Sequence, residues 1–140
     1  MIRLSVPGTL VYRDVAVRVV GSAARILRTN EPQTGSDLAD EFASQIVSAF
    51  GEAFNNLVIH GYRDMSPGRV DIEARNVDGV FELELRDSGR AFDPRSHQAV
   101  PDELPEGGMG LFIIRSFVDE VRYAEGPPNV LTLVKRIPTL

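Results

Sequence analysis

The sequence contains no cysteine and only two histidines among its 140 residues. Without cysteine, a disulfide framework and a cysteine-based zinc site are both excluded, and two histidines alone cannot form a multi-histidine metal site. Nowhere do about 18 apolar residues run together, as a membrane-spanning helix requires, and the first residues lack the features of a signal peptide. These absences predict a soluble, cytoplasmic protein that has no membrane segment.

Positive charge is scarce as well: the sequence has 15 Lys and Arg but 20 Asp and Glu, which gives a net charge of −5. A nucleic-acid-binding surface normally carries a basic stripe that neutralises phosphates, so we expect no direct contact with nucleic acid. Apolar residues make up 43% and charged residues 25%, which is typical of a folded globular protein. The length, with no repeat or linker, predicts one domain over residues 1–140.

Hydrophobic spacing predicts the order of the helices and strands. The segment 11–27 fits a helix through its recurrence every four residues (Val11, Val15, Val19, Ala23, Leu27), although part of it also alternates as a strand would, and its length favours the helix. A longer helix follows Asp37, and its apolar stripe ends near Gly61. A third helix is expected after Gly110. Strands are expected at residues 2–6, 69–76, 80–87, 121–123 and 130–134.

The two central strands are joined by Val77-Asp78-Gly79, a hairpin signal because Asp and Gly accept a positive φ. The element order predicts an α+β fold, with helices on one face of a mostly antiparallel sheet. Residues 93–107 are polar, contain three prolines and show neither period. We interpret them as a loop that could serve as a lid.

The second half of the long helix carries three polar residues four apart: Glu52, Asn56 and His60. They share one side of the helix, which borders the apolar stripe, so they would be half-buried. A carboxylate can orient or deprotonate a hydroxyl, and an amide oxygen is a suitable ligand for Mg²⁺. Alternatively, all three are ordinary solvated residues on the flank of the helix.

Two further segments combine glycine with chemistry-bearing positions. Asp87-Ser88-Gly89 ends a strand, where an aspartate can accept a hydrogen bond from an exocyclic amine, or where it simply forms a turn. Residues 107–110 contain three glycines directly before a helix, an arrangement that can direct N–H groups at phosphates or serve as a flexible link. The sequence has no P-loop lysine motif and no Rossmann glycine motif, so a nucleotide site would be of another kind.

The order and spacing of these three segments resemble the N, G1 and G2 boxes of the GHKL ATPases and kinases, which include gyrase, MutL and histidine kinases. Residues 52–62, EAFNNLVIHGY, and 106–121, EGGMGLFIIRSFVDEV, look specifically like the RsbW/SpoIIAB anti-sigma serine/threonine kinases. The resemblance runs from Glu52 to Leu133. It implies a Bergerat-type two-layer sandwich that binds ATP and Mg²⁺.

The resemblance also implies residue roles. Asn56 would bind Mg²⁺, and Asp87 would bond the adenine amino group. Glu52 would orient or deprotonate the acceptor hydroxyl. The remaining nucleotide contacts implied are Gly89 and Ala91 beside the base, Thr132 through water, and the phosphate-facing residues Gly108, Met109, Gly110 and Leu111.

The sequence departs from the family pattern at two of these positions. Ala91 stands where a glycine is usual, and Gly61 where an alanine is common. Neither change removes a catalytic atom. The loop 95–106 has one basic residue, so a cation that stabilises transferred charge would come from elsewhere, with Arg115 or a partner as candidates and a surface role for Arg115 as the alternative.

The function that the resemblance implies is a protein serine/threonine kinase that phosphorylates a STAS-domain anti-anti-sigma factor and, alternatively, sequesters a sigma factor. The N-terminal segment resembles the part through which this family forms homodimers. Three other interpretations stay open: a same-fold kinase with another target, a nucleotide-binding interaction module without transfer activity, and the catalytic domain of a sensor histidine kinase. The last is disfavoured because no helix pair with a phospho-acceptor histidine precedes the site.

Overall fold

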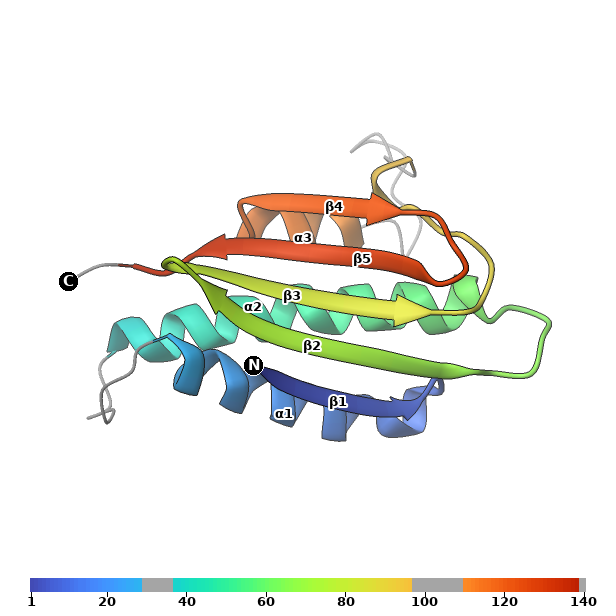
Figure 1. The fold of residues 1–140 in the computed structure, drawn as a ribbon, viewed down its shortest axis with the longest axis horizontal. Coiled ribbons are helices and arrows are strands. Elements are labelled where there is room, and N and C mark those ends of the chain that lie inside the picture. Colours follow the sequence, from blue (N-terminus) through green and yellow to red (C-terminus); the bar gives the residue numbers. More distant parts are fainter. Residues whose placement is uncertain (29–36, 97–109, 139–140) are drawn as a thin grey trace.

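The computed structural model of the chain describes residues 1–28, 37–96 and 110–138. Within these residues, helices pack on one face of a five-stranded sheet, and Figure 1 looks onto the sheet with the helices behind it. The helices are α1 (Arg13–Leu27), α2 (Asp37–Asn56) and α3 (Gly110–Phe117). The strands are β1 (Ile2–Pro7), β2 (Arg69–Val77), β3 (Val80–Asp87), β4 (Glu120–Ala124) and β5 (Asn129–Arg136).

The sheet has the order β1-β2-β3-β5-β4, and every neighbouring pair is antiparallel. The expected hairpin joins β2 to β3, with Asp78 at φ 51° and Gly79 at φ 83°, the left-handed conformations that such a turn needs. The predicted α+β fold with an antiparallel sheet is confirmed. The structure thereby brings the end of β3 next to the start of β5, far apart in sequence.

The first helix forms where the sequence left a choice, but of the expected stripe only Ala23 is fully buried. A 3₁₀ turn at Leu10–Tyr12 leads into α1. The residues buried against the molecule are Ala16, Val20, Ala23 and Ala24. Val11 and Val15 are 83% and 49% exposed, so the expected face is rotated by about one residue. This side of α1 is buried because its small alanine side chains allow α1 to lie close to α2.

The long helix α2 supplies the centre of the core. Phe42, Ile46, Ala49 and Ala53 are buried along the expected stripe, and Phe50 and Phe54 widen it. The α-helical hydrogen bonding ends at Asn56 and continues as one π-helical turn, Leu57–Gly61. Such turns are rare and often occur at functional sites. No pattern in the sequence predicts this one.

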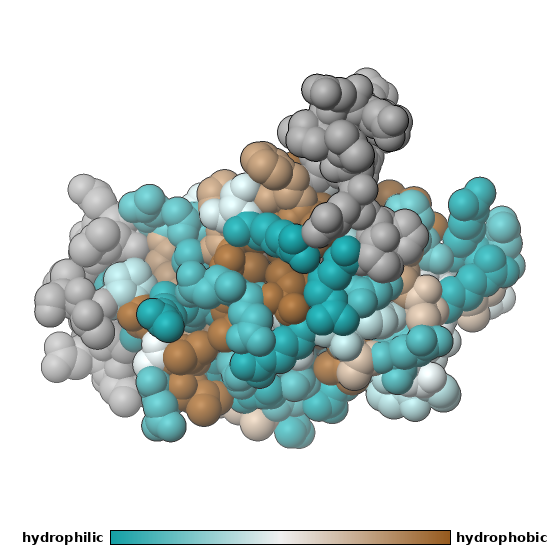
Figure 2. Space-filling view, turned by 90° about the horizontal axis from the view of Figure 1, so that it is seen from above, coloured by the Kyte–Doolittle hydropathy of each residue, from teal (hydrophilic) through white to brown (hydrophobic). Residues whose placement is uncertain are grey.

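The two faces of the sheet differ in character because side chains alternate along each strand. The face toward the helices is apolar, with a buried row formed by Ile72, Leu85 and Leu131 and a second by Ala74, Leu83 and Leu133. The opposite face carries ion pairs, among them Arg75 with Glu82 and Glu84. Seen from the β4 edge, hydrophilic side chains cover much of the surface, with apolar groups between them (Figure 2).

In the part of the chain that the structure describes, none of the helices combines the length and the apolar character needed to cross a membrane.

Candidate functional site

Asp87 interrupts the apolar face of the sheet at the end of β3. In register it lies between Val70 of β2 and Asn129 of β5, on the side that faces the helices. It is 9% exposed, whereas an unpaired carboxylate normally stays in water. A buried acid on a strand whose other helix-facing residues are apolar is therefore the first mark of a binding site.

The two carboxylate oxygens of Asp87 have different surroundings. Oδ1 accepts hydrogen bonds from the Gly89 backbone N–H at 2.9 Å and from Asn129 Nδ2 at 3.1 Å. Among the described residues, none donates a hydrogen bond to Oδ2. Burial raises the pKa of Asp87 above its usual value, while the bonds from Asn129 and Gly89 oppose that rise. The carboxylate thus has one anchored oxygen and one available acceptor.

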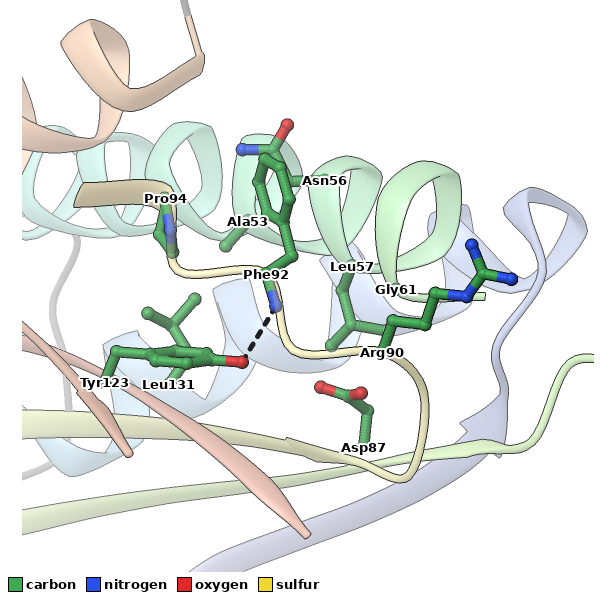
Figure 3. A pocket seen from close by; sticks show the side chains of 10 residues that line it. All are labelled: Ala53, Asn56, Leu57, Gly61, Asp87, Arg90, Phe92, Pro94, Tyr123 and Leu131. Carbon is green, nitrogen blue, oxygen red and sulfur yellow. Dashed lines mark hydrogen bonds between the residues drawn. The ribbon is translucent and has the colours of Figure 1, made fainter. Parts of the chain in front are cut away.

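A small cavity lies beside Asp87, between the sheet and the second half of α2. Its volume is about 20 Å³, which is enough for roughly one water molecule. Figure 3 shows the Asp87 carboxylate directed into it from the sheet side and Asn56 on the helix side. The lining residues are Ala53, Asn56, Leu57, Gly61, Asp87, Arg90, Phe92, Pro94, Tyr123 and Leu131.

Phe92 is one of the residues that line this cavity. Its ring stacks on His60 with centroids 4.3 Å apart and planes at 11°, and its backbone N–H donates to the Tyr123 hydroxyl at 2.9 Å. Burial raises the pKa of Tyr123, so its hydroxyl stays protonated at neutral pH and keeps a proton to donate. A flat ring is larger than this cavity, so lining side chains must move before one can enter.

Gly89 holds the segment after β3 against the π turn rather than lining the cavity. A Cβ on Gly89 would lie 2.7 Å from the backbone carbon of Gly61, and the Arg90 N–H bonds the Gly61 carbonyl at 2.7 Å. Ala91 is exposed and is also absent from the lining. Arg90 and Phe92 take the positions beside the cavity that the sequence assigned to Gly89 and Ala91.

This contact predicts opposite outcomes for two alanine substitutions. Gly89→Ala should lower the free energy of unfolding by about 1–3 kcal/mol, because backbone atoms must shift to admit the methyl group. Gly61→Ala should change it little, since the nearest atoms to its added Cβ are 3.6 and 3.7 Å away. Thermal or urea unfolding of both variants is the measurement. Equal stability of the two would contradict the packing described.

A second group of site residues lies where α3 begins. Glu52 and Asn56 are half-buried on α2, as the helical spacing predicts. A Cβ added to Gly110 would lie 3.1 Å from Asn56 Nδ2 and 3.3 Å from Glu52 Oε2. The first residue of α3 thus closes directly against both polar side chains. The positive end of the helix dipole faces a carboxylate and an amide there.

The other predicted phosphate-facing residues are placed only in part. Leu111 is buried in α3, and its side chain is part of the packing. Gly108 and Met109 lie outside the described residues, as does most of the predicted lid at 93–107. The described part of that loop forms a 3₁₀ turn, Pro94–Ser96. Arg115 is exposed on α3, as a surface role predicts.

Thr132 is not brought to the site. It pairs with Glu84 and Arg122, three residues along β5 from the partner of Asp87 and on the opposite face of the sheet. Strand alternation, which directs Leu131 and Leu133 to the helices, turns Thr132 away from them. Asn129 occupies the position opposite Asp87 instead. Only the strand register could have revealed it, and the sequence does not show that register.

The donor set decides what the site can hold. Within residues 1–28, 37–96 and 110–138, no three His, Asp or Glu side chains gather as a metal cluster would. Asn56 offers an amide oxygen, which suits a Mg²⁺ ion that keeps waters and phosphate oxygens as its other ligands. The free oxygen of Asp87 suits an exocyclic amine, and the backbone of Gly110 at the start of α3 suits a phosphate. In their hydrogen-bonding chemistry, these residues fit a nucleotide with Mg²⁺.

Comparison with known proteins identifies the family of this domain. The model of the histidine kinase-like ATPase domain matches residues 15–135. The chain belongs to the histidine kinase-like ATPase family. The expected resemblance to anti-sigma kinases is confirmed as well, because relatives of this ATPase domain include proteins with such names.

Two of these relatives show the extent of the similarity. The anti-sigma F factor of Halalkalibacterium halodurans is 36% identical over 89 residues, or 60% of this chain and 61% of that protein. The serine-protein kinase RsbW of Listeria innocua is 32% identical over 95 residues, or 60% of each. The chain thus spans about three fifths of the length of the curated relatives it matches.

Solved structures of this ATPase family share the fold. The histidine kinase domain of a blue-light activated kinase from Erythrobacter litoralis covers 89% of this chain at a TM-score of 0.57 and 17% identity, with 61% of that chain matched. The histidine kinase AdeS of Acinetobacter baumannii covers 99% at a TM-score of 0.52 and 12% identity, with 70% matched. At these identities the likeness concerns the fold alone.

Proposed function

We propose that this histidine kinase-like ATPase domain is an ATP-dependent serine/threonine kinase that acts on a protein partner. The observation that carries the proposal is the placement of Asp87, Asn56 and Glu52. The free oxygen of Asp87 faces a cavity that Asn56 also lines, and Glu52 lies one helical turn before Asn56 against the start of α3. One end of this arrangement suits an adenine, and the other suits phosphates and an acceptor hydroxyl.

Each residue has a separate task in this proposal. Asp87 accepts a hydrogen bond from the amino group of the base, Asn56 offers its amide oxygen to Mg²⁺, and the backbone at Gly110 faces the phosphates. ATP supplies the phosphoryl group, and Mg²⁺ neutralises its charge. Gly108, Met109 and Leu111 are proposed to add backbone N–H groups, as the family resemblance implies.

Glu52 serves the acceptor in this proposal. Its carboxylate orients the serine or threonine hydroxyl and takes its proton as the oxygen–phosphorus bond forms and the bond to ADP breaks. Phosphoryl transfer asks the protein mainly for positioning and for charge stabilisation. A half-buried carboxylate beside the metal-binding amide meets the requirement for positioning, and a Mg²⁺ ion held by that amide would supply charge stabilisation.

The partners are proposed from the relatives. Proteins named anti-sigma F factor and serine-protein kinase RsbW are 36% and 32% identical to this chain, each over 60% of its length. We therefore propose a STAS-domain anti-anti-sigma factor as the substrate, a sigma factor as the competing partner, and a homodimer as the working state. Incubation with γ-labelled ATP and purified STAS-domain proteins tests the transfer. Label on a serine or threonine supports the kinase, whereas nucleotide binding without any transfer leaves a nucleotide-dependent interaction module.

Substitution of Asn56 should separate metal binding from base binding. Asn56→Ala is expected to weaken ATP binding in Mg²⁺, because the cation loses a protein oxygen ligand. In EDTA, the variant and the wild type should bind ATP with nearly equal affinity. Titration calorimetry under both conditions is the measurement. A large loss in EDTA would point instead to collapse of the helix end.

A further inference from the structure

Asn129 is the most completely bonded polar side chain at the site, and no motif marks it. It is 3% exposed at the first position of β5, directly opposite Asp87. Its Nδ2 donates to Asp87 Oδ1 at 3.1 Å and to the Gly89 carbonyl at 3.0 Å. Its Oδ1 accepts the Gly126 N–H at 3.0 Å. One side chain therefore links the end of β3, the segment after it and the turn before β5.

This pattern fixes the amide in one orientation. If the amide were turned over, its oxygen would face the Asp87 carboxylate and the Gly89 carbonyl, two acceptors, and its NH₂ would face a backbone donor. With its orientation set, Asn129 can bond only the near oxygen of Asp87. The same Oδ1 also accepts the Gly89 N–H at 2.9 Å. Both hydrogen bonds therefore hold Oδ1 of Asp87 and leave Oδ2 facing the cavity.

We propose that Asn129 is a positioning residue for base recognition, and that it makes the site selective for purines with an exocyclic amine at position 6. Asn129 does not touch the base. It keeps the carboxylate of Asp87 from rotating, so that Oδ2 stays aimed as a hydrogen-bond acceptor. The inference rests on the proposed function, because it assumes that the base lies against Asp87.

The chemistry of the two purine classes explains the selectivity. A 6-aminopurine presents a donor at position 6, which pairs with the Asp87 oxygen. A 6-oxopurine presents an acceptor there, and the two acceptors repel. A carboxylate that could rotate would still bind the amine part of the time, but the hydrogen bond would be weaker and the discrimination smaller.

The test compares ATP with purine riboside 5′-triphosphate, which has hydrogen in place of the 6-amino group. Wild-type protein should bind ATP about tenfold or more tightly than this analogue, which corresponds to one buried hydrogen bond. In Asn129→Ala only the Gly89 N–H still anchors the carboxylate, so ATP affinity should fall and the preference should shrink to about threefold or less, while analogue affinity stays unchanged. Val130→Ala, on the outward face of the same strand, is the matched control and should keep the full preference.

A second variant guards against a simple folding defect. Asn129→Asp preserves the size of the side chain but replaces both donated hydrogen bonds with contacts between acceptors, so it should also lose the preference. Loss of affinity for both nucleotides by the same factor in the two variants would show a structural role and overturn the proposal, as would an unchanged preference. If wild-type protein binds both nucleotides equally, the placement of the base at Asp87 is itself wrong. If it binds neither, the proposed function fails.

Discussion

Replacement of Asp87 by asparagine is expected to weaken ATP binding by about 5- to 150-fold, the equivalent of about 1–3 kcal/mol. The shape of the side chain is kept. Its oxygen would stay where Gly89 and Asn129 donate to it, so the new NH₂ group would take the place of Oδ2. A donor would then face the amino group of adenine, which is also a donor. Titration calorimetry with Mg·ATP measures the loss.

The same substitution should act in the opposite direction on the unliganded protein. Burial raises the pKa of Asp87, which means that the folded protein holds the ionised carboxylate less favourably than the unfolded chain does. Ionisation of this group therefore lowers stability as pH rises through its unfolded and folded pKa values. Asp87→Asn removes that charge and should unfold at an equal or higher temperature than the wild type at neutral pH.

These two results together distinguish a binding residue from a structural one. A side chain that only supported the fold would lose stability and ligand affinity together when altered. Unchanged ATP affinity in Asp87→Asn would mean that the base lies elsewhere, and a large drop in thermal stability would mean that the carboxylate holds the fold.

Glu52→Gln is expected to give the largest kinetic effect in the protein. The amide keeps the size of the side chain but cannot take a proton, so kcat for transfer to a STAS-domain substrate should fall by roughly 10²- to 10⁴-fold. ATP affinity should stay near the wild-type value, because the carboxylate acts on the acceptor hydroxyl and not on the nucleotide. Single-turnover transfer from γ-labelled ATP measures the rate separately from binding.

Two quantities must be compared in Glu52→Gln: the rate of phosphoryl transfer and the affinity for ATP and the partner. A reduced rate with normal ATP and partner binding assigns Glu52 to the chemical step. Wild-type transfer rates would remove Glu52 from the mechanism. Arg115→Ala is a useful companion, because this exposed residue on α3 should have little effect on the rate if its role is that of a surface side chain.

Local signals in the sequence were sufficient for the main helices and strands and for the positions of Glu52, Asn56 and Asp87 within them. The Asp78-Gly79 turn could be predicted because its backbone conformation depends on those two residues alone. The spacing of Glu52 and Asn56 could be converted into a shared half-buried face because an α-helix has a fixed period. Asp87 stood out because it ends an alternating apolar strand.

The parts that sequence could not supply all depend on contacts between distant segments. Thr132 was expected to reach the adenine through water, but the register of β3 against β5 pairs Thr132 with Glu84 and puts Asn129 opposite Asp87. Helix α1 buries the side that carries its alanines, because small side chains let it approach α2 closely. Hydrophobicity alone does not predict which side of the helix is buried. The stacking of Phe92 on His60 depends on the π turn at Leu57–Gly61, for which no local signal exists.

The most direct test of the central claim is a crystal structure of the chain with Mg²⁺ and a non-hydrolysable ATP analogue. In that structure we expect the 6-amino group to lie within about 2.7–3.2 Å of Asp87 Oδ2. We also expect Mg²⁺ to be bound by Asn56 Oδ1 and the Phe92 ring to be displaced from His60. A nucleotide bound elsewhere, or bound with its base away from Asp87, would contradict it.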